Sequence, residues 1–206
     1  ALLIGEVWED ASNKISYGIR RRYFVDGALD SCMNYPFRKA ILDFIKGADD
    51  GQGFRETVMT IAENYPSQVL ACNMNLLGTH DTPRILTALM DDFEGSRAEY
   101  AQRRLSAEQK PQAKELLMAA SFLQFTLPGA PSIYYGDEAG MEGYKDPFNR
   151  RTYPWGQEDP ILLGHFRTLG QLKKNQPALQ LGDITFTHCS DRRLSFTRIY
   201  GNSQLT

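Results

Sequence analysis

The feature of this sequence that most restricts its fold is an alternation of short apolar runs with longer amphipathic segments. The apolar runs have the length of strands and lie at Leu2–Val7, Gly27–Met33, Val69–Leu77 and Ser132–Tyr135. Between them, apolar residues recur at helical spacing. Such alternation predicts an α/β fold of parallel βαβ units. Four strand–helix units make half of an eight-stranded (β/α)8 barrel.

Proline and glycine mark the ends of the predicted helices. The first is predicted to begin near Pro36 and to end at Gly47, and the second ends before Pro66. Further helices are expected just after Pro83, over Pro111–Leu127, and from Pro160, capped by Asp159, to about Lys174.

The pattern changes near the C-terminus. Asp183–His188 and Leu194–Tyr200 alternate apolar with polar residues around a turn-rich stretch, which predicts an antiparallel hairpin. A hairpin alone is too small to be stable. We therefore predict a half-barrel domain over residues 1–180 and the start of an all-β domain over residues 181–206.

Charge, apolar run length and cysteine content indicate which partners and which cellular compartment to expect. A formal net charge of −2 gives no electrostatic case for nucleic acid or an anionic membrane. The longest apolar run, Leu116–Leu127, is too short to span a bilayer. Three cysteines without metal-ligand spacing indicate free thiols, and hence a cytoplasmic protein. The chain opens on an apolar strand without an initiator methionine, so we expect it to be part of a longer protein.

Parallel barrels place functional residues at the carboxyl ends of their strands. Glu6 ends the first predicted strand among apolar residues, where a carboxyl loses hydration and its protonated form is favoured. A general acid for glycoside cleavage needs that property. Taken alone, however, a glutamate at a strand end is an ordinary loop residue as often as not.

His80 and Asp81 end the third predicted strand. A neighbouring His and Asp can hydrogen-bond adjacent sugar hydroxyls, and the carboxylate can stabilise a developing positive charge. An equally good interpretation is that Asp81 caps the next helix. Asp137 and Glu138, after the fourth strand, could be catalytic, but capping and loop ordering are the preferred interpretation for both. The loop Asp146–Trp155 mixes ionic, amide and aromatic groups, as sugar sites do, although a loop packing on its own aromatics would look similar.

Taken in this order, the motifs resemble the α-amylase superfamily of glycoside hydrolases, in particular its neopullulanase, cyclomaltodextrinase and α-glucosidase-like branch. Residues 5–8 (Gly-Glu-Val-Trp) are similar to the family's fifth barrel strand, Met33–Pro36 to the sixth, Asn75–Asp81 to the seventh and Pro131–Gly140 to the eighth. The resemblance covers roughly residues 1–180. It implies the C-terminal half of the catalytic barrel.

The same resemblance implies the roles of single residues. Glu6 would be the proton donor, and Trp8 would border the leaving-group side. His80 and Asp81 would hold the sugar at the point of cleavage and stabilise the transition state. Asp146 and Arg150 would contact glucose on the non-reducing side.

The family's nucleophile, an Asp on the fourth strand, has no counterpart in this sequence. We therefore expect a piece of a retaining α-glucan hydrolase whose isolated chain is inactive. A non-catalytic carbohydrate-binding or scaffold protein is the alternative, and hydrolysis and glycosyl transfer are not distinguished. The expected partner is an α-glucan oligosaccharide, with a homo-oligomer through open sheet edges also possible. No cofactor is predicted. Calcium is common in the superfamily, but no segment here spells a complete oxygen cage.

Overall fold

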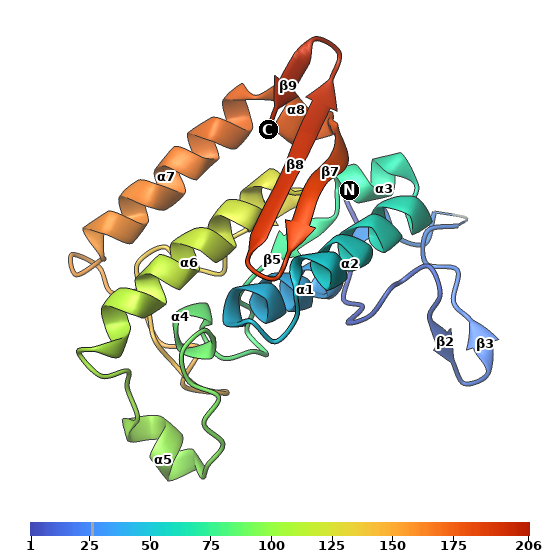
Figure 1. Ribbon diagram of the computed structural model, residues 1–206. Coiled ribbons are helices and arrows are strands. Elements are labelled where there is room, and N and C mark those ends of the chain that lie inside the picture. The colour runs from blue at the N-terminus through green and yellow to red at the C-terminus, as the bar shows by residue number, and fades with distance from the viewer. Residues whose placement is uncertain (26) are drawn as a thin grey trace. The chain divides into compact units, whose positions relative to one another are not determined.

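The computed structural model describes residues 1–25 and 27–206 (Figure 1). The chain forms two compact units. Unit 1 consists of Ala1–Leu76, Leu123–Ser132 and Leu172–Thr206, and unit 2 of Leu77–Phe122 and Ile133–Gln171. All the strands given below belong to unit 1, so the candidate residues that follow them in sequence are distributed over both units.

Unit 1 contains the helices α1 (Tyr35–Lys46), α2 (Gly51–Asn64), α3 (Ser67–Ala71) and α8 (Pro177–Leu181). Unit 2 contains α4 (Ile85–Ala88) and α5 (Arg97–Gln102), and it holds most of α6 (Gln109–Thr126) and α7 (Pro160–Asn175). The strands are β1 (Ile4–Gly5), β2 (Ile15–Ser16), β3 (Ile19–Arg20), β4 (Ser31–Cys32), β5 (Met74–Leu76), β6 (Ala130–Ser132), β7 (Asp183–Ser190), β8 (Arg193–Tyr200) and β9 (Ser203–Leu205).

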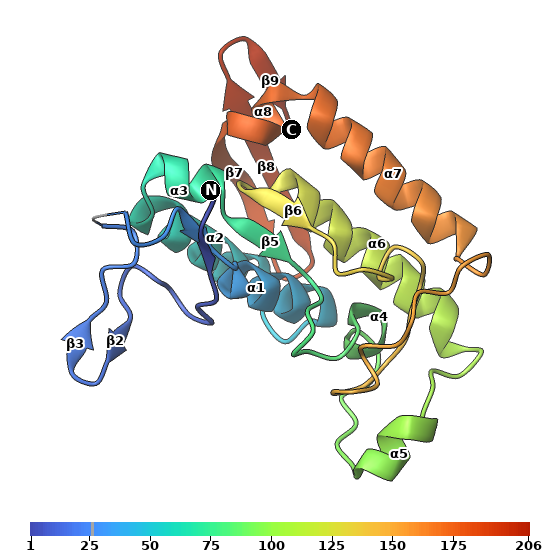
Figure 2. The same cartoon turned by 180° about the vertical axis from the view of Figure 1, so that it is seen from behind.

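The predicted strands of unit 1 are parallel, but among the described residues the hairpin β2–β3, not a helix, lies between β1 and β4. Strand β1 pairs in parallel with β4, and β5 pairs in parallel with β6. A parallel bridge between Met33 and Met74 joins the two pairs, which gives the order β1–β4–β5–β6. Figure 2 shows β5 and β6 side by side. Because parallel strands end at one edge, the segments that leave these strands start from the same side of the sheet.

The predicted strands had the wrong limits. Strands β1 and β4 are shorter than the predicted runs Leu2–Val7 and Gly27–Met33. The first part of Val69–Leu77 is helical, because α3 follows Pro66 and Val69 lies buried on it. The last strand begins earlier than predicted and ends at Ser132, so Ile133–Tyr135 lie outside it. The pairing of this strand begins at Ala130, whose amide donates to the Asn73 carbonyl at 2.8 Å. Apolar runs alone did not distinguish sheet residues from neighbouring helix and loop residues.

Buried amide side chains fix how β4, β5 and β6 meet. The Asn34 side chain donates to the Asn75 side chain, and Asn75 donates to the Pro128 carbonyl, both at 2.8 Å. Gln124 donates to the backbone carbonyls of Asn75 and Ser132 at 3.0 and 2.8 Å. Asn34, Asn75 and Gln124 are each 1% exposed. Since buried polar groups must be paired, these bonds specify the strand arrangement.

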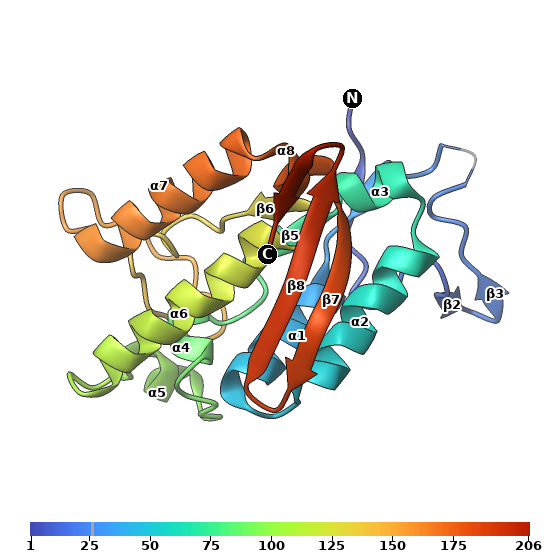
Figure 3. The ribbon, with the colours of Figure 1, turned by 45° about the horizontal axis from the view of Figure 1, so that its top comes forward.

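Helix α1 begins and ends where the sequence predicted and α2 ends before Pro66 as predicted, whereas α3 and α8 were not predicted. Asn34 caps α1 by accepting from the Phe37 amide, and Gly47 ends it with a φ of +72°, a conformation that glycine adopts without strain. Asp50 caps α2. Phe54, on the buried side of α2, packs edge-on against Phe186 of β7, with ring centroids 6.2 Å apart. Figure 3 shows β7 and β8 lying along α1 and α2.

The predicted C-terminal hairpin is confirmed, because β7 and β8 pair antiparallel and β9 adds a third strand. Arg198 of β8 anchors this sheet within unit 1. Its guanidinium donates to the Gly182 carbonyl, at 3.2 and 2.7 Å, and to the Thr126 carbonyl at the end of α6. The side chain is buried, and burial lowers the pKa of Arg198 to about 10. The domain boundary near residue 180 stays a prediction.

The short hairpin β2–β3 was not predicted. It turns at Tyr17 and Gly18, which have φ values of +54° and +73°, and Tyr17 is 94% exposed. Figures 1 and 2 both show it standing away from α1 and α2. Among the described residues, no helix combines the length and the apolar character that crossing a bilayer would require.

Candidate functional site

Glu6 and Trp8 follow β1 in unit 1, and both contact Tyr35, the first residue of α1. The Tyr35 hydroxyl donates to Glu6 Oε1 at 3.1 Å. The Trp8 ring stacks on the Tyr35 ring, with centroids 4.0 Å apart and an interplanar angle of 15°. Tyr35 therefore links the predicted proton donor to the predicted leaving-group residue, a role that the sequence analysis missed.

The expected apolar surroundings of Glu6 are wrong for this structure, since its side chain is exposed. Glu6 follows β1 and does not lie on it, and the burial of its neighbour Val7 does not extend to the Glu6 side chain. Trp8 is likewise 51% exposed. Both groups can reach a ligand without movement of the chain.

In unit 2, a tight turn presents His80 and Asp81 (both side chains half exposed, 3.3 Å apart). The Thr79 amide donates to the Thr82 hydroxyl at 3.1 Å, and the Asp81 amide donates to the Thr79 hydroxyl at 3.2 Å. Helix α4 begins only at Ile85, without a side-chain cap. The interpretation of Asp81 as a helix cap is therefore wrong, and its carboxylate is available for another role.

Arg150 connects the remaining predicted residues of unit 2. Its guanidinium donates to Asp81 Oδ1 at 3.0 Å and lies 2.9 Å from Asp146 Oδ1. It also donates to the His80 carbonyl at 3.0 Å. His80, Asp81, Asp146 and Arg150 thus form one exposed group, which we call the Arg150 group. Because the guanidinium contacts both carboxylates, it fixes their positions on the surface of unit 2.

The side chain of Asn149 fixes the backbone that carries the Arg150 group. Its buried side chain donates to the carbonyls of His80 and Thr82 at 2.7 and 2.8 Å. It therefore ties the Asp146–Arg150 loop to the turn that carries Asp81. Sequence reasoning missed this residue, although an amide between two predicted ligand residues is a usable signal.

A buried ion pair supports the same turn. Arg84, with no exposed surface, pairs with Asp137 at 3.2 Å. The Arg84 guanidinium also lies 4.3 Å from the centroid of the Tyr134 ring. Glu138 Oε2 accepts from the Gly136 amide at 2.8 Å. These contacts confirm that Asp137 and Glu138 order the loop.

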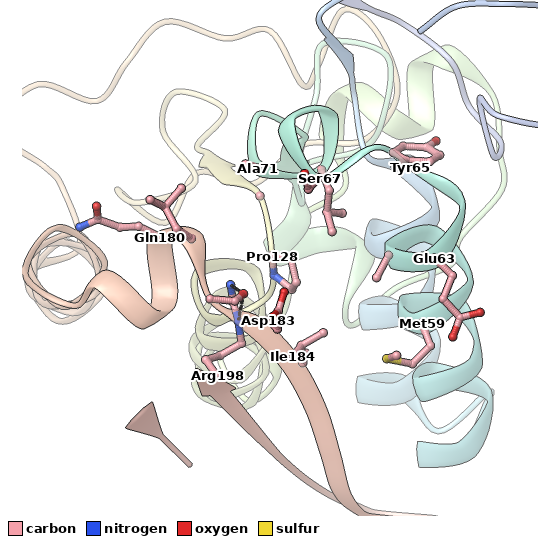
Figure 4. Close-up of a pocket in the computed structure, with 15 residues that line it drawn as sticks. Met59, Glu63, Tyr65, Ser67, Ala71, Pro128, Gln180, Asp183, Ile184 and Arg198 are labelled. Carbon is pink, nitrogen blue, oxygen red and sulfur yellow. Dashed lines mark hydrogen bonds between the residues drawn. The ribbon is translucent and has the colours of Figure 1, made fainter. Parts of the chain in front are cut away.

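Unit 1 also contains a hollow of about 260 Å³, which Figure 4 shows in close-up. Its lining includes Glu63, Tyr65, Pro128, Asp183 and Arg198. Pro128 precedes β6, so the hollow lies where that strand enters the sheet, away from the edge that carries Glu6. The Arg198 guanidinium is already bound to backbone carbonyls. None of the predicted site residues lines this hollow.

Comparison with known proteins agrees with the motifs. The family model described as the catalytic domain of α-amylase matches residues 1–179. An amylopullulanase of Thermoanaerobacter thermohydrosulfuricus is 38% identical over 96% of the chain, and a cyclomaltodextrinase of Geobacillus thermopakistaniensis is 32% identical over 97%. The chain spans only 13% and 30% of these relatives.

Solved structures give the same result for the fold. A cyclic α-maltosyl-(1→6)-maltose hydrolase from Arthrobacter globiformis covers 98% of the chain with 26% identity and a TM-score of 0.78, and the chain covers 40% of it. A Nostoc punctiforme debranching enzyme covers 99% with 25% identity and a TM-score of 0.77. By the family model and by these relatives, the chain belongs to the α-amylase family, as part of its catalytic domain.

Proposed function

We propose that this chain supplies the general acid and the transition-state carboxylate of a retaining α-glucan hydrolase. Its substrates would be α-glucosidic bonds of the starch, pullulan or cyclodextrin type. The observation that supports this most directly is the Arg150 group, in which Arg150 joins residues predicted from two separate motifs. The names of the relatives, amylopullulanase and cyclomaltodextrinase, support the substrate class.

In the proposed mechanism, Glu6 protonates the glycosidic oxygen as the bond breaks. The Tyr35 hydroxyl, which donates to Oε1, orients the carboxyl and leaves its second oxygen to carry the proton. The exposed face of Trp8 would contact the leaving sugar.

Asp81 would stabilise the positive charge that develops on the sugar ring, since a fixed carboxylate favours an oxocarbenium-like transition state. His80, Asp146 and Arg150 would hold hydroxyl groups of the bound glucose residues. Water or a second sugar could then release the product, so hydrolysis and transfer use the same residues.

A retaining mechanism also requires a nucleophile on the opposite face of the bond. The 206 residues contain no match to the family's nucleophile motif. The chain spans less than a third of the relatives named above. We therefore propose that the nucleophile belongs to a further part of a longer protein, and that the 206-residue chain alone does not hydrolyse α-glucans.

The test compares the 206-residue chain with the longer protein encoded by the same gene. Reducing-sugar release from maltooligosaccharides and cyclodextrins should be absent for the first and present for the second. In the longer protein, Glu6→Gln should abolish turnover and preserve glucan binding, whereas Glu56→Gln, at an exposed position of α2, should have no effect. Steady turnover by the 206-residue chain would refute the division of catalytic groups. Binding without turnover by the longer protein would favour the scaffold alternative.

A further inference from the structure

Two aromatic side chains of unit 2 form an exposed surface next to the Arg150 group in sequence. Trp155 is 82% exposed, and its ring lies 4.5 Å from the Tyr153 ring, centroid to centroid, at an interplanar angle of 51°. We call this pair the aromatic platform. An exposed tryptophan that packs on a second ring, outside the core, is the kind of apolar surface that binding sites present.

The segment that carries the platform is fixed at both ends. On one side, the Tyr135 hydroxyl donates to the Arg151 carbonyl at 2.7 Å. On the other, the Asp159 amide donates to the Ala139 carbonyl at 3.0 Å, and the Asp159 side chain caps α7. Between them, the Gln157 amide closes a turn on the Pro154 carbonyl at 2.9 Å. A surface held in this way loses little conformational entropy when a ligand binds.

Charged groups surround Tyr153. Loss of hydration raises its pKa, and the carboxylates of Glu138 and Glu158 raise it further, with Glu138 also within hydrogen-bonding reach of the hydroxyl. The positive charge of Arg167 acts in the opposite direction. An aromatic surface bordered by carboxylates and a guanidinium matches a sugar, because the flat apolar face of a pyranose stacks on a ring while its hydroxyls need polar partners. A protein interface would instead place its charges away from the aromatic centre.

We propose that the aromatic platform binds glucose residues of an α-glucan chain at some distance from the bond that is cleaved. The identity of the ligand rests on the proposed function. The platform belongs to the same loop of unit 2, Asp146–Trp155, as Asp146 and Arg150. A glucan of several residues would contact both the platform and these two residues, so the platform would favour long chains over maltose.

The two tryptophans of the chain, Trp8 and Trp155, allow a direct test. In the Trp8→Phe variant of the 206-residue chain, Trp155 is the sole tryptophan, and its fluorescence is titrated with maltoheptaose. We expect a saturable change in emission that cellohexaose does not produce. Tyr153→Ala should weaken the apparent affinity about tenfold, as expected for the loss of about 1.4 kcal/mol of aromatic stacking. Tyr17→Ala, at an exposed tyrosine of unit 1, is the control and should change nothing.

A Trp155 emission that stays constant, or that responds equally to cellohexaose, overturns the platform. The converse variant, Trp155→Phe, keeps Trp8 as a reporter beside Glu6, and turnover by the longer protein is measured separately. If Trp155 fluorescence does not respond to maltoheptaose while turnover is normal, the platform does not bind glucan and the proposed function is unaffected. If turnover is absent while Trp155 fluorescence still responds to maltoheptaose, the proposed function is wrong and the platform proposal is supported. Circular dichroism of each variant confirms that it is folded.

Discussion

Replacing Asn75 with leucine should destabilise the protein by about 3 kcal/mol, because the change leaves two buried polar groups without partners. Asn75 accepts from the Asn34 side chain and donates to the Pro128 carbonyl, both at 2.8 Å, and is 1% exposed. Each orphaned group costs about 1–3 kcal/mol. The apolar side chain that replaces the amide returns about 1 kcal/mol of burial energy. The net loss is therefore about 3 kcal/mol, a large part of the stability of an ordinary domain.

Urea denaturation, followed by circular dichroism, measures this loss as a lower midpoint at constant slope. Asn202→Leu, at an exposed position, is the control and should shift the midpoint little. A double-mutant cycle of Asn34→Ala and Asn75→Ala should give a coupling energy of about 1 kcal/mol. A midpoint for Asn75→Leu equal to that of the control, or purely additive effects in the cycle, would refute the role of the amides in fixing the sheet.

Three further predictions concern charges and strand edges. Burial, together with the nearby Arg198 charge, lowers the pKa of Lys173 to about 7 from 10.5. Between those two pH values the unfolded chain binds more protons than the folded chain, so the free energy of unfolding in urea should rise with pH, by up to about 1.4 kcal/mol per pH unit. The Lys173→Met variant should show a smaller rise. Asp137→Asn should destabilise the protein by about 3–5 kcal/mol, because it leaves the Arg84 guanidinium buried without its partner charge, whereas Asp146→Asn, at an exposed pair, should cost less than about 1 kcal/mol in the same urea assay. In the part of the chain that the structure describes, β1 and β6 each pair with another strand along one edge only, which leaves the other edge available for association. Light scattering should therefore detect association at micromolar concentrations, and a constant monomer mass would contradict this prediction.

The helices were predictable because their signals are local. Pro36, Gly47 and Asp159 mark helix ends in the sequence, and the structure places caps or termini at each. Helix α5 was not predicted, although its capping box, Ser96 with Glu99, is also a local signal. Strand limits were less predictable, since an apolar run continues into neighbouring segments while pairing depends on distant partners such as Asn73 and Ala130.

The candidate site was predictable only in part. Two motifs suggested the residues of the Arg150 group, but nothing local indicates that Arg150 reaches Asp81. The family resemblance placed the two in one site, and the fold of unit 2 provides the contact. Tyr35 and Asn149 were missed because a tyrosine in a helix start and an asparagine in a loop have ordinary structural explanations. Their importance follows from hydrogen bonds that only the folded chain makes.

The hydrogen bonds of Arg198 couple the C-terminal sheet to the helices of unit 1 during unfolding. One guanidinium from the C-terminal sheet binds the carbonyl of Thr126, the last residue of α6, and the carbonyl of Gly182, which caps the end of α8. Fraying of either helix or detachment of β8 breaks the same bonds and leaves a buried charge without its ligands. The C-terminal strands therefore share one cooperative unfolding unit with the parallel sheet, and their backbone amides should exchange with solvent at the same slow rate as those of β5.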